Sequence, residues 1–245
     1  NSATGNSSAS GGAIANFGTI ESITGYFINN SATSTSYSTS GGAIYNGDTI
    51  ESIIGDFIGN SANSTSNAYG GAIYNSGTIS SITGDFIGNS ATGYYASGGA
   101  IYNSGTISSI TGDFDSNSAT GQSYAYGGAI YNDGTVLNNG TISSITGDFI
   151  GNSATSTNTG VYGGAIYNYS RGTITSVADA SDSEDSLQDD ILFQGNYVED
   201  KNGKRYEAIY NEGVINITSN NGGSYTFYDY INGNNKGTLN FVSDD

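Results

Sequence analysis

Short apolar runs alternate with glycine-rich polar turns along this chain, and the pattern returns at a regular spacing. Gly-Gly-Ala-Ile begins at residues 11, 41, 70, 98, 127 and 163, so successive copies are 30, 29, 28, 29 and 36 residues apart. A second motif, Phe-x-x-Asn, follows each copy, at 27–30, 57–60, 86–89, 114–117, 149–152 and 193–196. Residues 207–211 form a degenerate seventh copy of the first motif. Self-similarity at this period indicates a repeat architecture.

Each repeat predicts three short β-strands. In the copy that begins at Gly70, the runs Ala-Ile-Tyr-Asn, Thr-Ile-Ser-Ser-Ile and Asp-Phe-Ile-Gly-Asn are rich in β-branched and aromatic residues and are separated by turn-forming pairs. No apolar stripe with helical spacing extends beyond two turns without a glycine, which disfavours helix. A unit of about 29 residues with three strands has the dimension of one coil of a parallel β-helix. We therefore expect an all-β, single-stranded parallel β-helix, or β-solenoid, of seven to eight coils.

Stacking of the coils places aligned residues in columns about 4.8 Å apart. Three isoleucine columns and one phenylalanine column should fill the interior, where each buried side chain contributes roughly 1.5 to 3 kcal/mol. An asparagine column should form hydrogen bonds from coil to coil. We assign these columns a structural role; their central members are Ile44, Ile73, Ile101 and Ile130, with Ile50, Ile79 and Ile107 and with Ile53, Ile82 and Ile110, then Phe57, Phe86, Phe114 and Phe149, and Asn46, Asn75, Asn103 and Asn132.

The segments between the two motifs vary in composition, and we expect them to be loops that project from one corner. They are residues 31–40, 61–69, 90–97, 118–126 and 153–162. The chain reads as one solenoid domain, 1–245, with regular coils in 1–177, an acidic insertion and a basic cluster in 178–206, and divergent coils in 207–245. Residues 178–190 carry six carboxylates, and Lys201, Lys204 and Arg205 are expected to fold back on them.

Composition excludes several classes of protein. The 245 residues include no Cys, Pro, Met, Trp or His, which removes thiolate and imidazole chemistry and ordinary zinc or copper sites. Five Lys and Arg stand against 22 Asp and Glu, a net charge of -17, which argues against nucleic acid or an anionic membrane as a partner. No run of 18 apolar residues is present, so we expect no membrane insertion by a helix of this chain.

Gly-Gly-Ala-Ile alternating with Phe-x-x-Asn resembles the repeats of the chlamydial polymorphic membrane proteins and of related autotransporter passengers and adhesins of Gram-negative bacteria. The resemblance covers roughly residues 1–217. It implies a right-handed β-helix that is exported, displayed extracellularly at the cell surface, and used in adhesion or as structural material such as a matrix filament. The alternative is an excerpt of a passenger that acts as a monomeric binding module.

Carboxylates recur in one column, at Asp56, Asp85, Asp113 and Asp148. A polysaccharide-degrading enzyme would need a carboxylate pair at one place, with Lys or Arg to hold an acidic sugar, and the regular coils carry only Arg171. We therefore expect no catalytic residues and no cofactor. Stacked carboxylates are candidate ligands for Ca²⁺, as is the acidic cluster at 179–190, and the competing interpretation is a turn whose Asp caps backbone groups.

Two further columns should point outward. A tyrosine column is a candidate surface for host or matrix glycans or proteins, or it merely covers the sheet. A Thr column with a Ser or Thr two residues on, such as Thr106 and Ser108, is a candidate ice-binding face, although solvated β-strands commonly carry such residues. The tyrosines are Tyr45, Tyr74, Tyr102, Tyr131, Tyr167 and Tyr210.

The ends of the chain suggest self-association. The opening residues match the Asn-Ser-Ala-Thr that follows later Phe-x-x-Asn motifs, so the first coil begins inside a repeat, where unpaired backbone groups are a template for another strand. A β-favouring run near the other end could supply that strand and generate a head-to-tail filament of copies of the chain. The segments concerned are Asn1, Ser2, Ala3 and Thr4, and Thr238, Leu239, Asn240, Phe241 and Val242.

Overall fold

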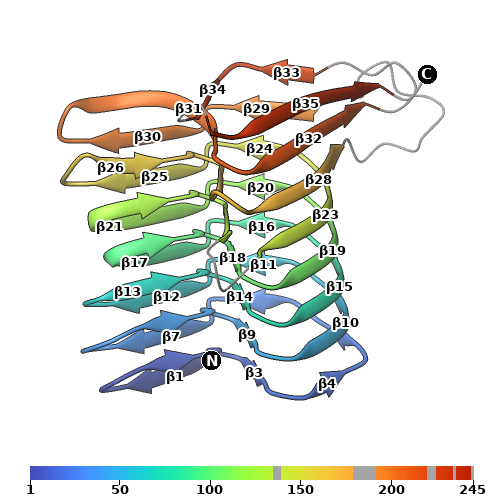
Figure 1. Cartoon of the computed structure of the whole chain (residues 1–245). Helices are drawn as coiled ribbons and strands as arrows, with labels where there is room; N and C mark the ends of the chain where they lie inside the picture. The colour runs from blue at the N-terminus through green and yellow to red at the C-terminus, as the bar shows by residue number, and fades with distance from the viewer. Residues whose placement is uncertain (135–138, 179–190, 220–224, 234–235, 244–245) are drawn as a thin grey trace.

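The computed structural model describes residues 1–134, 139–178, 191–219, 225–233 and 236–243, and these contain strands but no helix. The chain winds upward as a right-handed coil from the N-terminus, and strands of successive coils lie one above another (Figure 1). Nearly all ladders are parallel, with residues of one coil paired with the equivalent residues of the next. The predicted parallel β-helix is confirmed.

Two sheets form the back and the right of the solenoid in Figure 1. The back sheet has seven strands: β6 (Phe27–Ile28), β11 (Phe57–Ile58), β16 (Phe86–Ile87), β20 (Phe114–Asp115), β24 (Phe149–Ile150), β29 (Ile191–Gln194) and β33 (Tyr225–Phe227). The right sheet has nine: β4 (Thr19–Ile20), β5 (Ile23–Thr24), β10 (Thr49–Ile54), β15 (Thr78–Thr83), β19 (Thr106–Thr111), β23 (Thr141–Thr146), β28 (Thr173–Ala178), β32 (Val214–Ser219) and β35 (Thr238–Ser243).

The third sheet combines the front strands with arms that extend to the left. The front strands are β3 (Ile14–Asn16), β9 (Ile44–Asn46), β14 (Ile73–Asn75), β18 (Ile101–Asn103), β22 (Ile130–Asn132), β27 (Ile166–Asn168), β31 (Gly203–Asn211) and β34 (Tyr230–Asn232). The arms are β1 (Ser2–Gly5), β2 (Ala9–Ser10), β7 (Ser31–Ser34), β8 (Thr39–Ser40), β12 (Ser61–Ser64), β13 (Asn67–Tyr69), β17 (Ser90–Ser97), β21 (Ser118–Tyr126), β25 (Ser153–Ser156), β26 (Gly160–Tyr162) and β30 (Tyr197–Asp200).

The arms correct the expectation of loops at one corner. In the arms within residues 1–162 the chain runs outward, turns and returns, and both limbs pair in register with the limbs of neighbouring arms. Small apolar residues alternate along the limbs and fill the narrow space between them. They form a second core, separate from the main one: Ala62, Ala68, Ala91, Ala96, Ala119, Ala125, Ala154, Val161 and Val198. An alternating strand pattern hidden in Ser, Thr and Ala therefore orders these segments.

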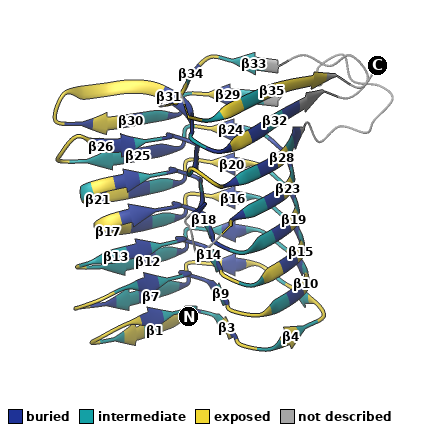
Figure 2. Cartoon of the chain, viewed as in Figure 1, coloured by how far each residue is buried: buried dark blue, intermediate teal, exposed yellow. Residues whose placement is uncertain are grey.

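The main core contains the predicted columns, and the same positions are buried coil after coil (Figure 2). The Phe rings of the back sheet stack face to face, with centroids 4.8 Å apart between Phe57 and Phe86 and between Phe86 and Phe114. On the right sheet, Ile79 and Ile82 are both fully buried although they are three residues apart. Strict alternation would put them on opposite faces, so the strand bends between them to keep both inside.

The Gly-Gly pair is required where the arm joins the front strand. Gly70 has a φ of +62°, which glycine adopts without steric cost, and a Cβ there would collide with the carbonyl oxygen of Ile73. A Cβ on Gly71 would collide with the carbonyl oxygen of Gly99 in the next coil. The motif therefore allows a tight corner at which adjacent coils approach backbone to backbone.

Candidate functional site

The predicted tyrosine column lies on the front strands, on the face opposite the isoleucines. Neighbouring rings stack with centroids 5.0 to 5.4 Å apart from Tyr45 to Tyr210. The rings are less accessible than a simple outward face would be, since Tyr45, Tyr74, Tyr102 and Tyr131 are half-buried and Tyr167 and Tyr210 are buried.

A second tyrosine row, from the returning limbs of the arms, covers the first. Tyr69 contacts Tyr102, with centroids 4.9 Å apart, and Tyr162 contacts Tyr210 at 4.5 Å. Tyr126 likewise lies 5.1 Å from Tyr167. This row was not predicted from the sequence. A signal for it was present, since each of its members directly precedes a Gly-Gly pair. The two rows form one aromatic surface in the angle between arms and front strands.

Burial keeps the phenol groups of this surface protonated. Desolvation raises the pKa of Tyr102, Tyr131 and Tyr167 well above the ordinary value, and the nearby carboxylate of Asp133 adds to the effect at Tyr102 and Tyr131. The hydroxyl of Tyr102 donates to Asp133 Oδ2 at 2.7 Å. Asp133 is 3% exposed and follows Asn132 at the end of a front strand. The surface thus combines aromatic faces with a buried carboxylate.

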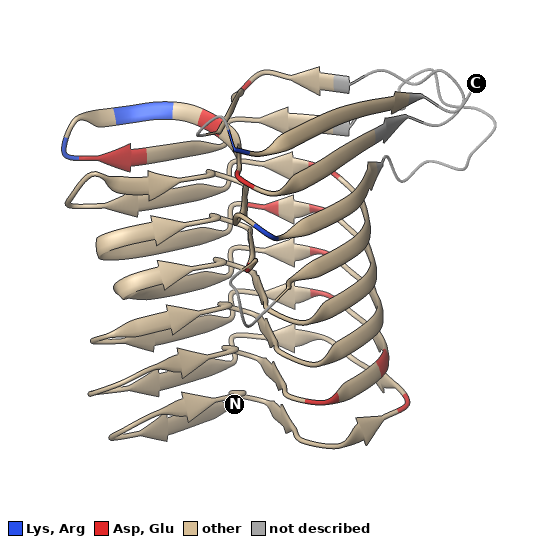
Figure 3. Ribbon diagram, in the orientation of Figure 1, with Lys and Arg blue, Asp and Glu red and all other residues tan. Residues whose placement is uncertain are grey.

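The aspartate column lies at the corner before the back strands, where acidic residues recur in successive coils (Figure 3). Asp56 Oδ1 accepts the backbone N–H of Asp85 at 3.0 Å, and Asp85 Oδ1 accepts that of Asp113 at 2.9 Å. Asp113 and Asp148 accept the N–H groups of Asp148 and Leu192 in the same way. This geometry favours a capping role, and no group of three or more potential ligands for a metal ion occurs among the described residues. The calcium hypothesis stays a prediction, and the cluster at 179–190 lies outside the described residues.

Two asparagine ladders bind the coils together. In the front ladder, Asn75 Nδ2 donates to Asn103 Oδ1 at 2.8 Å, and the predicted column continues from Asn46 to Asn132 by the same contact. The asparagines of Phe-x-x-Asn form the second ladder, which the sequence analysis did not assign. Asn89 Oδ1 accepts both the backbone N–H and the side-chain amide of Asn60. Both ladders are fully buried in the central coils, where their amides replace hydrogen bonds to water.

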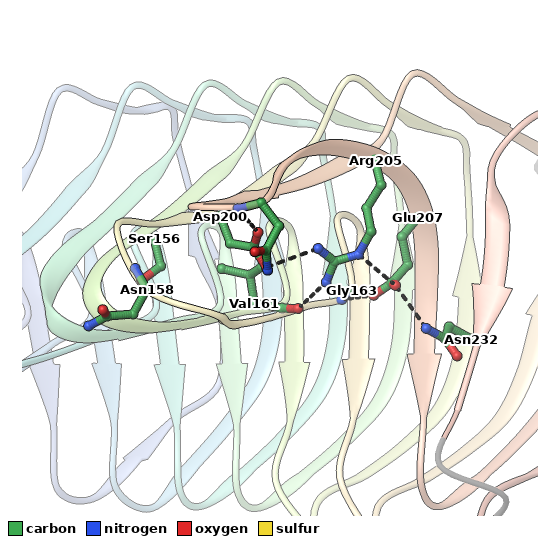
Figure 4. Close-up of polar contacts among 9 residues, drawn as sticks. Ser156, Asn158, Val161, Gly163, Asp200, Arg205, Glu207 and Asn232 are labelled. Carbon is green, nitrogen blue, oxygen red and sulfur yellow. Dashed lines mark hydrogen bonds and ion pairs between the residues drawn. The ribbon is translucent and has the colours of Figure 1, made fainter.

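The basic cluster belongs to a charged hairpin that covers the last arm. Strands β30 and β31 pair antiparallel across Tyr197–Asp200 and Gly203–Tyr206, unlike the two separated limbs of the other arms. Arg205 reaches Asp200 Oδ2 at 3.1 Å, Glu207 Oε2 at 3.9 Å and the carbonyl oxygen of Val161 at 3.0 Å (Figure 4). Lys204 Nζ lies 3.5 Å from the centre of the Tyr197 ring. The expected partner of these cations, residues 178–190, lies almost entirely outside the described residues.

Glu207 links the hairpin to the coils on either side. It stands where the other copies of the motif have the second glycine, it is 2% exposed, and desolvation raises the pKa of its carboxyl. Its Oε1 accepts the N–H of Gly163 at 2.8 Å, and its Oε2 accepts the amide of Asn232 at 3.1 Å. These contacts and Arg205 stabilise the ionised form against the cost of burial.

A protein-family model matches part of the chain. The profile described as the Chlamydia polymorphic membrane protein (Chlamydia_PMP) repeat matches residues 24–47, a stretch that contains one Phe-x-x-Asn motif and the next Gly-Gly-Ala-Ile. No curated protein and no solved structure matches the chain. Within the described residues, no helix has the length and apolar character needed to cross a membrane. The resemblance inferred from the two motifs is confirmed where it is tested: residues 24–47 are similar to a repeat of the Chlamydia polymorphic membrane proteins.

Proposed function

We propose that this chain is a non-catalytic structural and adhesive module displayed at the surface of a Gram-negative bacterium. The name of the matching family, a membrane protein repeat, supports surface display. The structural role is supported by the hydrogen bonds that the recurring polar side chains form between coils. The asparagine ladders and the aspartate column are both engaged from coil to coil, so the repetition stabilises a rod instead of building one reactive site.

The competing function is that of a polysaccharide-degrading β-helix enzyme. Such an enzyme needs two carboxylates that converge on one cleft, one as acid and one as base or nucleophile. Here each carboxylate of the aspartate column accepts a backbone N–H of the next coil. A panel of neutral and acidic polysaccharides incubated with the chain tests the choice. We expect no new reducing ends, and cleavage that disappears with one Asp substitution would overturn the structural function.

We further propose that the solenoid associates end to end. Among the strands of the described residues, β4 and β5 pair with β10 at the N-terminal end of the right sheet, and β35 pairs with β32 at its other end. The second isoleucine column ends on Ile20 and Leu239, which are half-buried, whereas Ile50 inside the column is fully buried. Stacking of two copies would continue the column and bury both ends, with roughly 25 cal/mol gained per Å² of apolar area.

The proposed stack brings together other segments than Asn1–Thr4 and Thr238–Val242, the pair expected from the sequence. β1 pairs with β7 in the arm sheet, whereas β35 belongs to the right sheet. A head-to-tail stack therefore places β35 of one copy on β4 and β5 of the next. The contact is heterologous and does not close, so it extends into a filament.

Sedimentation velocity over a range of concentrations tests this association. We expect species larger than one chain that dissociate when residues 237–245 are deleted or when Leu239→Lys puts a charge on the end of the column. Circular dichroism of both variants should retain the β spectrum, because the other ladders are untouched. A chain that sediments as a monomer at every concentration would overturn end-to-end association and leave a monomeric adhesive module.

A further inference from the structure

The second tyrosine row, which runs from Tyr69 to Tyr162, is interrupted at Ser97. In the register of the arms, Tyr69 pairs with Ser97, Ser97 with Tyr126, and Tyr126 with Tyr162. Each tyrosine of this row packs against a ring of the first row in the next coil, as Tyr69 packs against Tyr102. At Ser97 the corresponding space in front of Tyr131 has no ring from the row to fill it.

The gap is a pocket with aromatic walls. Tyr69 and Tyr126 line it from the coils on either side of Ser97, and Tyr102 and Tyr131 line it from the front strands. Tyr95, which stacks on Tyr124 with centroids 5.2 Å apart, lines it from the arm. Because the side chain that occupies this position in neighbouring coils is a phenol ring, the pocket has room for one six-membered ring.

Polar groups surround the aromatic walls. Asp133, whose carboxylate accepts the Tyr102 hydroxyl, lines the pocket together with Asn67 and Ser97. Within the described residues, the Asn67 side chain forms no hydrogen bond, so it can donate to and accept from a ligand. Among the described residues that line the pocket there is no Lys or Arg. An acidic ligand would meet the carboxylate of Asp133 without a compensating cation.

We propose that this pocket binds a neutral pyranose ring of a glycan. The apolar C–H faces of a pyranose stack on tyrosine rings, and its hydroxyls donate to a carboxylate and exchange hydrogen bonds with an amide. A buried carboxylate beside aromatic rings favours a ligand with many hydrogen-bond donors. Without a cation in the lining, the carboxylates of uronic and sialic acids would be repelled. The inference rests on the proposed adhesive function and assigns it a ligand class.

The chain provides its own blocking substitution. Ser97→Tyr completes the row with the residue that stands at the equivalent positions 69, 126 and 162, so it fills the pocket with a side chain that this register already accepts. Ser40→Tyr is the matched control, because Ser40 pairs with Tyr69 in the same column but does not line the pocket. Asp133→Asn is a second variant, which keeps the shape of the carboxylate and removes its charge.

Saturation-transfer NMR of the full chain tests the proposal with methyl glycosides of glucose, galactose, mannose and N-acetylglucosamine. Ligands with few atoms in contact bind weakly, so titration runs to about 20 mM. We expect at least one neutral glycoside to bind, with affinity reduced at least tenfold by Ser97→Tyr, reduced severalfold by Asp133→Asn, and unchanged by Ser40→Tyr. Methyl glucuronide and tetramethylammonium should bind at least tenfold more weakly than the neutral glycoside.

Three outcomes would overturn the sugar pocket: no neutral glycoside binds, Ser97→Tyr binds as well as the unmodified chain, or the glucuronide or the ammonium ion binds best. Sedimentation of Ser97→Tyr separates this inference from the proposed association, because the pocket lies away from both ends of the right sheet. Loss of sugar binding with unchanged sedimentation is expected, and circular dichroism confirms that each variant is folded.

Discussion

The Asp229 carboxylate accepts two hydrogen bonds from Asn196, one from the backbone N–H at 2.7 Å and one from the side-chain amide at 2.9 Å. In the preceding coils an asparagine occupies the position equivalent to Asp229. Asn60, for example, accepts the same pair of hydrogen bonds from Asn30. An asparagine also carries donors that need a partner, whereas an ionised carboxylate only accepts. Asp229 therefore ends the second asparagine ladder in the described structure without leaving a donor unpaired.

Asp229→Ala should destabilise the C-terminal coils. The substitution leaves the backbone N–H and one amide hydrogen of the buried Asn196 without an acceptor, and a buried unsatisfied group costs about 1 to 3 kcal/mol. Urea unfolding followed by circular dichroism measures the loss. Asp229→Asn retains an acceptor and should lose less. Equal stability of Asp229→Ala and the unmodified chain would show that the ladder needs no such end.

Asn89→Asp should be more damaging, because it breaks the same ladder in the middle. Asn89 Nδ2 donates to Asn117 Oδ1 at 2.9 Å and to the carbonyl oxygen of Phe57 at 2.8 Å, and a carboxylate would face both oxygens without a hydrogen. A buried charge without a partner costs about 3 to 5 kcal/mol. Thermal unfolding measures the effect.

Asn6→Asp is the matched control, because Asn6 is exposed and its substitution adds the same charge outside the ladder. We expect its melting temperature to stay close to that of the unmodified chain. If both variants melt together, net charge and not the ladder would account for the loss.

Alkaline pH should unfold the protein by way of the tyrosine rows. The pKa of Tyr102, Tyr131 and Tyr167 is raised in the folded state, so above about pH 10 the unfolded chain releases these protons first. The unfolded state then binds fewer protons than the folded state, and stability falls as pH rises. Absorbance at 295 nm should show these tyrosines ionising together with the loss of the β spectrum. Ionisation of every tyrosine near pH 10 in a folded chain would contradict this burial.

Asp85→Asn separates backbone capping from calcium binding. An amide oxygen can still accept the N–H of Asp113, and loss of one charge relieves repulsion within the aspartate column, so stability should stay level or rise slightly. Calcium should shift the melting temperature of neither chain. A melting temperature that rises with Ca²⁺ in the unmodified chain, and not in Asp85→Asn, would establish the column as a metal site instead.

How far the sequence determines the structure differs from feature to feature. The front strands and the columns of Ile73 and Phe86 were predictable, because a fixed period aligns equivalent residues and β stacking converts alignment into contact. The order in the arms was harder to predict. Ala68 and Ala96 lie in stretches of Ser, Thr, Asn and Tyr, and only the fold brings them together as a core between two limbs.

The candidate site was predicted only in part. The first tyrosine row follows from the period of the repeats. The second row, which covers it, does not, because the position of Tyr69 next to Gly70 says nothing about the angle between an arm and a front strand. The pocket at Ser97 depends on that angle and on one departure from the row. Asp133 belongs to a segment that interrupts the repeat, so no column analysis would place it beside Tyr102.

End-to-end stacking in register is tested most directly by a crosslink between the two ends of the right sheet. The chain has no cysteine, so Thr19→Cys and Thr238→Cys together provide two unique thiols. Both positions belong to one column of the right sheet, in which Thr19 pairs with Thr49 and Val214 pairs with Thr238. Thr49→Cys with Thr238→Cys is the control, because Thr49 lies inside the stack, paired on both sides. With a short bifunctional thiol crosslinker, the account predicts a ladder of covalent multimers from the first pair and none from the control. Monomers alone from the first pair, at concentrations where larger species sediment, would contradict it.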